Sequence, residues 1–252
     1  MKINEWLLVL SFLFFFGSSI GWCLEVVYRR FFEERKWMNP GFLTGPYLPL
    51  YGFSLCAVYL MAHINITFIE NKYVQRIVLF VLMSVIVTII EYIAGMIFIR
   101  HMKIKLWDYT DNWGNVKGII CPKFSFYWVV LSAIYYFIIH PLILDVLKWL
   151  ARHLAFSFVI GFFYGVFVVD LCYSMNIMSK VREFATYNKL VIKYEELKES
   201  IRRINEENGS KVSFIFAMKS ELSLTENLKR YLERGQDKLG NIKKKVTSRG
   251  EK

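Results

Sequence analysis

The chain has 252 residues, of which 55% are hydrophobic and 17% aromatic, and its formal net charge is +11. The apolar residues come in long blocks, which excludes an ordinary soluble domain and indicates a membrane protein. Residues 179–252 carry 18 basic and 11 acidic side chains, and so hold +7 of the net charge. A basic tail after a membrane domain is typical of a surface that faces anionic lipid. Because no recognition motif accompanies this charge, we expect no nucleic-acid partner.

Five stretches are long and apolar enough to cross a bilayer core of about 30 Å, which takes roughly 20 residues. They run from Trp6 to Tyr28, Tyr47 to Phe68, Val74 to Ile99, Phe124 to Leu147 and Leu154 to Met178. The first has the bulky Trp22 where a cleavage site needs a small residue, so we interpret it as a true span. The predicted fold class is an all-α polytopic membrane bundle of about five helices over residues 1–178, followed by a basic helical tail over residues 179–252.

Basic residues are concentrated after the first and third predicted spans and in the tail. The positive-inside rule therefore predicts an outer N-terminus and a cytoplasmic C-terminus in a cell membrane. Six tryptophans lie near predicted span ends, where aromatic anchors are common. They are Trp6, Trp37, Trp107, Trp113, Trp128 and Trp149.

The connection between the first two spans, residues 39–52, holds three of the five prolines and three glycines. Proline removes an amide donor and glycine reaches backbone angles that other residues avoid, so the pattern predicts an irregular, fixed path. Irregular backbone beside a membrane persists only where protein or a wet cavity satisfies its polar groups. We therefore predict that this stretch lines the interior and that the helices adapt to it.

Three acidic residues fall inside predicted spans: Glu25, Glu91 and Asp170. At 1.5 Å per residue all three lie in the inner half of the membrane. Intramembrane carboxylates usually face a bundle interior or a cavity, where they pair, bind cations or relay protons. Glu25 has an alternative, because it can sit at the lipid interface in a salt bridge with Arg29 one turn later.

The third connection, residues 100–123, alternates aromatic, polar and glycine residues, as in Trp107-Asp108-Tyr109 and Asn112-Trp113-Gly114-Asn115. This composition predicts a segment with turns that lies on the membrane surface. It shares the predicted cytoplasmic face with residues 39–52. Two interpretations stay open: a cap over a cavity floored by the three acids, or an interfacial loop held by its tryptophans.

Four motifs together resemble a known family. They are Gly21-Trp22 with Glu25, the string Asn39-x-Gly41-Phe42-Leu43-x-Gly45-Pro46-x-x-Pro49-x-Tyr51-Gly52, Glu91-Tyr92 with Gly95, and Trp107-Asp108-Tyr109 followed by Asn115 and Gly118. Over roughly residues 6–170 the chain resembles the bacterial integral-membrane family labelled putative ABC-transporter type IV permease, the CmpB-like group. The resemblance implies a multi-pass protein of the bacterial plasma membrane with a place in a transport complex.

The resemblance and the depth of the acids together nominate residues for binding a substrate or ion in a cavity, with no catalytic role assigned. These candidates are Glu25, Asn39, Gly41, Gly45, Pro46, Pro49, Tyr51, Gly52, Glu91, Asp108, Tyr109, Asn115, Gly118 and Asp170.

The tail shows a heptad seam on a helix that we expect to continue from the fifth span. The seam residues are Leu190, Tyr194, Leu197, Ile201 and Ile204. A second seam, from Leu228 to Val246, follows the capping box Ser223-x-x-Glu226. Two heptads alone are marginal, so the pattern predicts a cytoplasmic coiled-coil hairpin or a dimer. Residues 180–246 are then the predicted surface for a separate ATP-binding subunit or another cytoplasmic protein.

Several motifs are absent from the sequence. Without a G-x-x-x-x-G-K-[ST] loop, the chain is not an ATP-hydrolysing subunit of the usual kind. The cysteines stand singly, and the four histidines show no metal-ligand spacing, so we expect no metal and no cofactor. These residues are Cys23, Cys56, Cys121, Cys172, His63, His101, His140 and His153.

Three functional hypotheses remain. The first is a permease-like transport component with an inner-facing acidic cavity and no ATPase activity of its own. The second is a membrane-anchored signalling or assembly scaffold that recruits partners through the tail. The third is an intramembrane lipid-modifying enzyme, in which Asp108, Tyr109 and the acids serve as acid and base groups.

Overall fold

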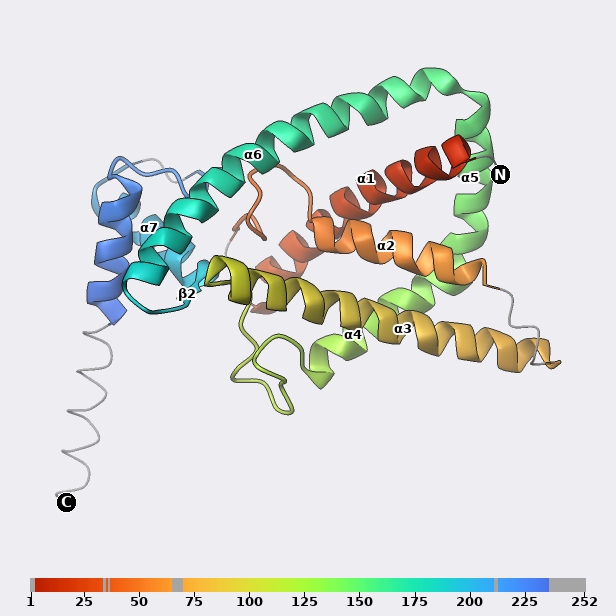
Figure 1. Cartoon of the computed structure of the whole chain (residues 1–252), viewed down its shortest axis with the longest axis horizontal. Helices are drawn as coiled ribbons and strands as arrows, with labels where there is room; N and C mark the ends of the chain where they lie inside the picture. The colour runs from red at the N-terminus through yellow and green to blue at the C-terminus, as the bar shows by residue number, and fades with distance from the viewer. Residues whose placement is uncertain (1–2, 34, 36, 65–69, 211–212, 236–252) are drawn as a thin grey trace.

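Uninterrupted apolar runs form the long helices, and a helical tail packs on one end of the bundle (Figure 1). The computed structural model describes residues 3–33, 35, 37–64, 70–210 and 213–235. The elements in chain order are α1 (Ile3–Tyr28), η1 (Arg29–Glu33), α2 (Pro49–Ala62), α3 (Lys72–Ile97), η2 (Phe98–Met102), β1 (Ile104–Lys105), α4 (Pro122–Ile134), η3 (Tyr135–Ile139), α5 (His140–Arg152), η4 (Leu154–Phe156), α6 (Ser157–Tyr187), β2 (Ile192–Lys193) and α7 (Tyr194–Glu207). Residues 224–235 form a further helical segment.

Four of the five predicted spans are confirmed as helices long and apolar enough to cross a membrane. They are Trp6–Phe32, Lys72–Met102, Pro122–Leu147 and Ser157–Tyr187. This arrangement confirms the all-α polytopic fold class. The second predicted span differs, because α2 has only 14 residues, or roughly 21 Å of helix. Its predicted end, residues 65–68, lies outside the described residues.

The α2 helix is short because the proline and glycine stretch before it reaches into the bundle. Residues 39–48, the re-entrant segment, contain no helix, and the Leu48 N–H donates to the Ser18 carbonyl in α1 at 2.9 Å. From there α2 returns along α1, so that Tyr59 packs on Trp6 with ring centres 6.1 Å apart. The predicted irregular path is therefore confirmed, and α2 follows the segment as a shorter apolar helix.

The two ends of the bundle gather different parts of the chain. Short parallel strands β1 and β2 pair Ile104 with Ile192 and Lys105 with Lys193, which joins the loop after α3 to the tail. We call this the tail end, and the opposite end, where the N-terminus lies in Figure 1, the N-terminal end.

The predicted unbroken helix from the last span into the tail is wrong. The α6 helix ends at Tyr187, and Lys189 takes a left-handed conformation with φ of 52° before β2 and α7 begin. This break turns α7 back onto the bundle instead of projecting it away.

The predicted seam is buried against the bundle's own tail end. Leu197 and Ile201 are fully buried in a cluster with Met178, Val181 and Leu228, from α6 and the segment 224–235. The apolar face that would have paired in a coiled coil is thus covered within the chain. The coiled-coil pairing stays a prediction, and the rest of the second seam, Leu239, Ile242 and Val246, lies outside the described residues.

Glycines let α1 and α2 approach closely. A Cβ atom on Gly52 would lie 2.2 Å from Ser18 Oγ, and one on Gly21 would lie 2.2 Å from the Tyr51 ring. Side chains at either position would push the helices apart. The candidate residue Gly52 therefore has a packing role, and Pro49 occupies the first turn of α2, where no amide partner is needed.

We predict that Gly52→Ala destabilises the bundle by about 1–3 kcal/mol, because the added methyl overpacks a tight contact. Thermal unfolding of the purified protein in detergent measures the change. Gly161→Ala in α6 is the matched control, since a Cβ there meets nothing within 4 Å. The control should be neutral or stabilising by up to ~1 kcal/mol. Equal melting temperatures for Gly52→Ala and the wild type would contradict the close packing.

Candidate functional site

The re-entrant segment is held at its first residue by a side-chain amide. Asn39 is buried, and its Oδ1 accepts a hydrogen bond from Trp22 Nε1 at 2.7 Å. Its Nδ2 donates to the carbonyls of Leu43 at 3.2 Å and Thr44 at 2.8 Å. One amide thus satisfies two main-chain carbonyls that have no helical partner, and Gly41 supplies the positive φ of 73° that the bend requires.

The other end of the segment is held by Asp170 of α6. Its carboxylate accepts from the backbone N–H groups of Thr44 at 3.1 Å and Gly45 at 2.7 Å. It also accepts from Tyr47 Oη at 2.7 Å and Ser174 Oγ at 3.0 Å. Four donors converge on one intramembrane acid, which explains how α6 can carry a carboxylate. Asp170 therefore anchors the segment, and it does not join the other two acids.

Glu25 and Glu91 belong to one cluster built by aromatic donors. Glu25 Oε2 accepts from Tyr51 Oη at 2.9 Å, and the Tyr51 ring packs on Trp128 with ring centres 5.0 Å apart. Trp128 Nε1 donates to Glu91 Oε2 at 3.0 Å, and Tyr109 Oη donates to Glu91 Oε1 at 3.3 Å. Two of the three predicted acids are thus brought together across four helices and a loop.

The two carboxylates have different surroundings. Glu25 forms the predicted salt bridge with Arg29, Nε to Oε1 at 3.0 Å, and its side chain is 23% exposed. Glu91 is 2% exposed, and within the described part of the chain its hydrogen-bond partners are the two neutral donors, Trp128 and Tyr109. Glu91 is therefore the more costly carboxylate to keep ionised.

A chain of ion pairs leads from Glu25 to the tail. Arg29 also contacts Glu195 of α7, Nη1 to Oε2 at 3.1 Å, and Glu195 pairs with Lys198 at 3.0 Å. The buried Lys198 ammonium donates to the carbonyls of Asn39 at 2.9 Å and Gly41 at 3.1 Å. The tail thus contacts both the acidic cluster and the re-entrant segment.

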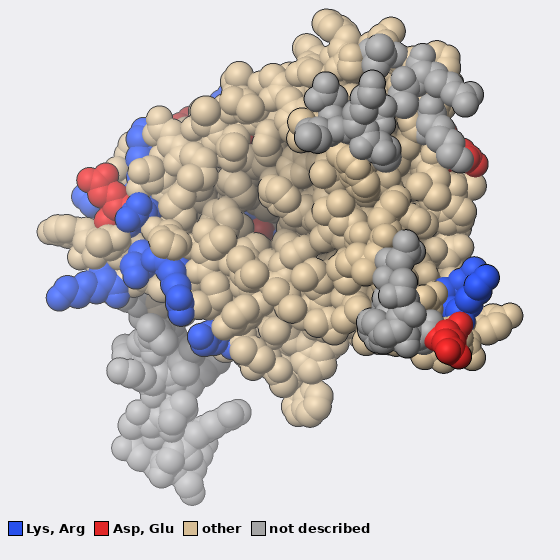
Figure 2. Space-filling view, turned by 45° about the vertical axis from the view of Figure 1, so that its right-hand side comes forward, with Lys and Arg blue, Asp and Glu red and all other residues tan. Residues whose placement is uncertain are grey.

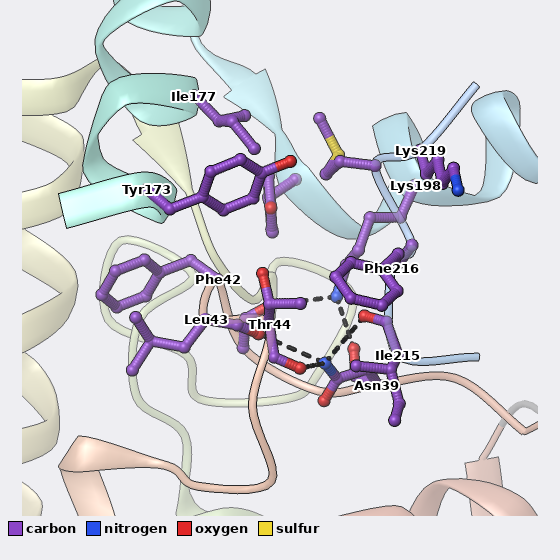
Figure 3. A pocket seen from close by; sticks show the side chains of 14 residues that line it. Asn39, Phe42, Leu43, Thr44, Tyr173, Ile177, Lys198, Ile215, Phe216 and Lys219 are labelled. Atoms are coloured by element: carbon purple, nitrogen blue, oxygen red, sulfur yellow. Dashed lines mark hydrogen bonds between the residues drawn. The ribbon is translucent and has the colours of Figure 1, made fainter. Parts of the chain in front are cut away.

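A small cavity lies where the tail meets the re-entrant segment (Figure 3). Figure 3 shows Asn39, Thr44 and Lys198 around it, with Phe216 and Tyr173 closing its sides. Its volume of about 20 Å³ is enough for a water molecule and too small for an organic substrate.

The loop after α3 is folded by its own polar residues. Asn115 Nδ2 donates to the carbonyls of Thr110 and Asn112, while its Oδ1 accepts from the Gly118 N–H at 2.9 Å. Gly118 has φ of 65°, and a Cβ there would collide with Lys105 Nζ. Asn115 and Gly118 therefore shape the loop that carries Tyr109 to Glu91.

Asp108 ties this loop to the tail. Its carboxylate contacts Lys105 Nζ at 2.6 Å and Lys193 Nζ at 3.0 Å. Burial raises the pKa of the Asp108 carboxyl, but the hydrogen bonds from Lys105, Thr110 and Lys193 outweigh it and hold that pKa well below its ordinary value. The same contact raises the pKa of the Lys193 ammonium.

The remaining sequence predictions concern Pro46 and Trp128. Pro46 is exposed in the isolated chain, at the turn between Gly45 and Tyr47, two of the residues that bind Asp170. Trp128 was predicted as an interfacial anchor, and this is wrong, because the side chain is 8% exposed and bonds Glu91. The sequence does not predict Glu195 and Lys198 as site residues, because a three-residue spacing is typical of an ordinary ion pair on a surface helix.

We predict that Asp108→Asn flattens the acid branch of the stability profile. Because the folded-state pKa lies below the unfolded value of about 3.9, the Asp108 contribution is present above that pH and is lost as pH falls. The melting temperature of the wild type should therefore drop more steeply than that of the variant as pH falls from about 5 to about 2. Asp111→Asn, in the same loop, is the control; a variant profile that parallels the wild type would refute the assignment.

One comparison with known proteins gives a match. The profile of a family described as putative ABC-transporter type IV matches residues 12–175, which include most of α1, all of α2 to α5 and most of α6. No curated protein and no solved structure matches the chain. The matched region contains Glu25, Glu91, Asp170 and the re-entrant segment. It ends before the tail, so Glu195 and Lys198 lie outside it. Since the match covers more than half of its length, the chain belongs to the putative ABC-transporter type IV family.

Proposed function

We propose that this membrane protein is the permease-like component of a transport complex and that the Glu25 and Glu91 cluster takes up a proton or a small cation. The observation that carries the proposal is Glu91, a carboxylate 2% exposed in a membrane helix whose partners in the described residues are neutral donors. A buried anion without a cation in contact is costly, so binding of positive charge there is favourable.

The charges around the cluster support the same conclusion. Arg29 is shared between two carboxylates, Glu25 at 3.0 Å and Glu195 at 3.1 Å, so its charge is not available to Glu91 alone. Tyr51 and Trp128 pack on each other between the two acids and direct their polar groups at Glu25 and Glu91. A proton, an alkali cation or a small amine fits this chemistry.

Access to an acidic interior is supported by the surface of the bundle. Figure 2 shows a largely uncharged flank with a hollow near its middle, in which acidic atoms are visible, while basic side chains gather toward the tail end. The hollow supports the proposal that the acidic interior can be reached from the surface of the bundle.

The tail provides the coupling that a transport complex needs. Through Glu195 and Lys198 it contacts Arg29 and the re-entrant segment, so a partner that moves α7 acts directly on the region of the site. Since the sequence has no phosphate-binding loop of its own, we propose that a separate ATP-binding subunit docks on residues 180–235 at the cytoplasmic face of a bacterial plasma membrane.

The alternative is a membrane scaffold, and the firm docking of the tail on the bundle favours it equally. The lipid-enzyme hypothesis has less support. Its candidate base Asp108 is neutralised by Lys105 and Lys193, and Asn115 and Gly118 are occupied in shaping the loop.

We predict that Glu91→Gln abolishes cation or proton uptake while leaving the amount of protein in the membrane unchanged. With purified protein on a solid-supported membrane, a jump in pH or cation concentration should give a charge-displacement current that the variant lowers at least about tenfold. Glu70→Gln, an exposed acid between α2 and α3, is the control and should keep the current. An undiminished current in Glu91→Gln would refute the role of this carboxylate.

Affinity purification in mild detergent separates the transporter from the scaffold. A stoichiometric ATP-binding subunit should accompany the tagged protein, and Arg203→Glu on the half-exposed face of α7 should reduce its recovery. Arg76→Glu is the control, because the exposed Arg76 lies near the start of α3, away from the tail. If cytoplasmic proteins without nucleotide-binding motifs come down instead, the scaffold hypothesis replaces the permease.

A further inference from the structure

Two histidines meet at the N-terminal end of the bundle, away from the carboxylate cluster. The rings of His63 and His140 have centres 5.8 Å apart and planes at 79°. They come from different helices: His63 is the C-terminal cap of α2, and His140 is the first residue of α5. Their separation in the sequence is why no metal-ligand spacing is visible there.

The ring orientation of His63 is set by a main-chain carbonyl. His63 caps the C-terminus of α2, and its Nδ1 lies 2.9 Å from the Tyr59 carbonyl oxygen. A carbonyl only accepts hydrogen bonds, so Nδ1 carries the proton and the lone pair of the neutral ring is on Nε2. A metal-binding histidine characteristically donates its second nitrogen to such a carbonyl.

The position of His140 depends on a π-helical turn. In a regular α-helix residues five apart lie about 140° apart around the axis. The wider turn η3 brings Tyr135 and His140 onto one side, where Tyr135 Oη and His140 Nδ1 are 3.0 Å apart. Single π turns are frequent at functional sites, and Pro141, which lacks an N–H, follows directly.

We propose that His63 and His140 bind a divalent transition-metal ion of the Zn²⁺ class through their Nε2 atoms. Two imidazole nitrogens at about 2.0–2.1 Å from a tetrahedral metal place the ring centres roughly 5–6 Å apart, and the observed 5.8 Å lies in this range. Both second nitrogens have partners that fix the rings, and the C-terminal end of the α2 dipole favours a cation.

Water completes the coordination sphere in this proposal. Among the residues that the structure describes, no group of three or more His, Cys, Asp and Glu side chains is arranged for a metal. A two-histidine site of this kind is open to solvent on the side of the exposed His63. The ion would clamp the end of α2 to the bend between α4 and α5, so the inference does not depend on the proposed transport function.

The direct test is Zn²⁺ titration of the full-length protein, purified through a tag that contains no histidine and followed by calorimetry. One site is expected, and His63→Ala and His140→Ala should each weaken it at least about tenfold. His153→Ala is the matched control, because its Nδ1 makes the same contact with a carbonyl, Trp149 O at 2.8 Å, without a second histidine beside it. Wild-type affinity in either His63→Ala or His140→Ala, or an equal loss in His153→Ala, would overturn the proposal.

A second measurement needs no variant. Diethyl pyrocarbonate modifies histidine nitrogens that are free, and mass spectrometry reports the extent at each residue. Saturating Zn²⁺ should reduce modification of His63 and His140 in the wild-type protein and leave His153 unchanged. If all three stay equally reactive with Zn²⁺ present, the two rings do not share an ion.

Discussion

Main-chain hydrogen bonding inside the membrane is the constraint on which the rest of this structure depends. The re-entrant segment brings non-helical backbone to the level of Ser18, where lipid offers no partners. Asp170 satisfies two amides, Asn39 satisfies two carbonyls, and Lys198 satisfies two more. An intramembrane acid, a buried amide and a buried lysine are thus retained because together they replace the hydrogen bonds of a helix.

This constraint also explains features that look unrelated. The α2 helix is short because the segment before it is not helical, and α1 carries glycines where α2 and Tyr51 must approach. The tail cannot be an independent appendage, since Lys198 completes the hydrogen bonding of the segment and Asp108 joins the loop after α3 to Lys193. The tail is therefore joined to the interior by a few short, charge-assisted contacts.

Much of the architecture could be predicted from the sequence. The length of the apolar stretches predicted the long helices, and the prolines and glycines of residues 39–52 predicted the irregular path. Depth along a helix, however, does not determine the direction in which a side chain points. Glu25, Glu91 and Asp170 are predicted to share a depth, yet Asp170 faces the re-entrant segment while Glu91 faces Trp128. The spacing of apolar residues predicted the tail seam. It did not predict that the seam packs on α6 and β1, because that packing depends on the turn at Lys189.

The shared guanidinium of Arg29 links the chemistry of the interior to the tail. It contacts Glu25 at 3.0 Å and Glu195 at 3.1 Å, so neutralising Glu25 weakens the first of these contacts and leaves the second in place. Glu195 in turn holds Lys198 against the re-entrant segment. In the proposed function, a proton or cation that binds the carboxylate cluster would therefore change the balance of a short chain of ion pairs that ends on the tail. Occupancy of the proposed membrane site would then affect the tail without a large rearrangement, because consecutive charged groups of this chain lie about 3 Å apart.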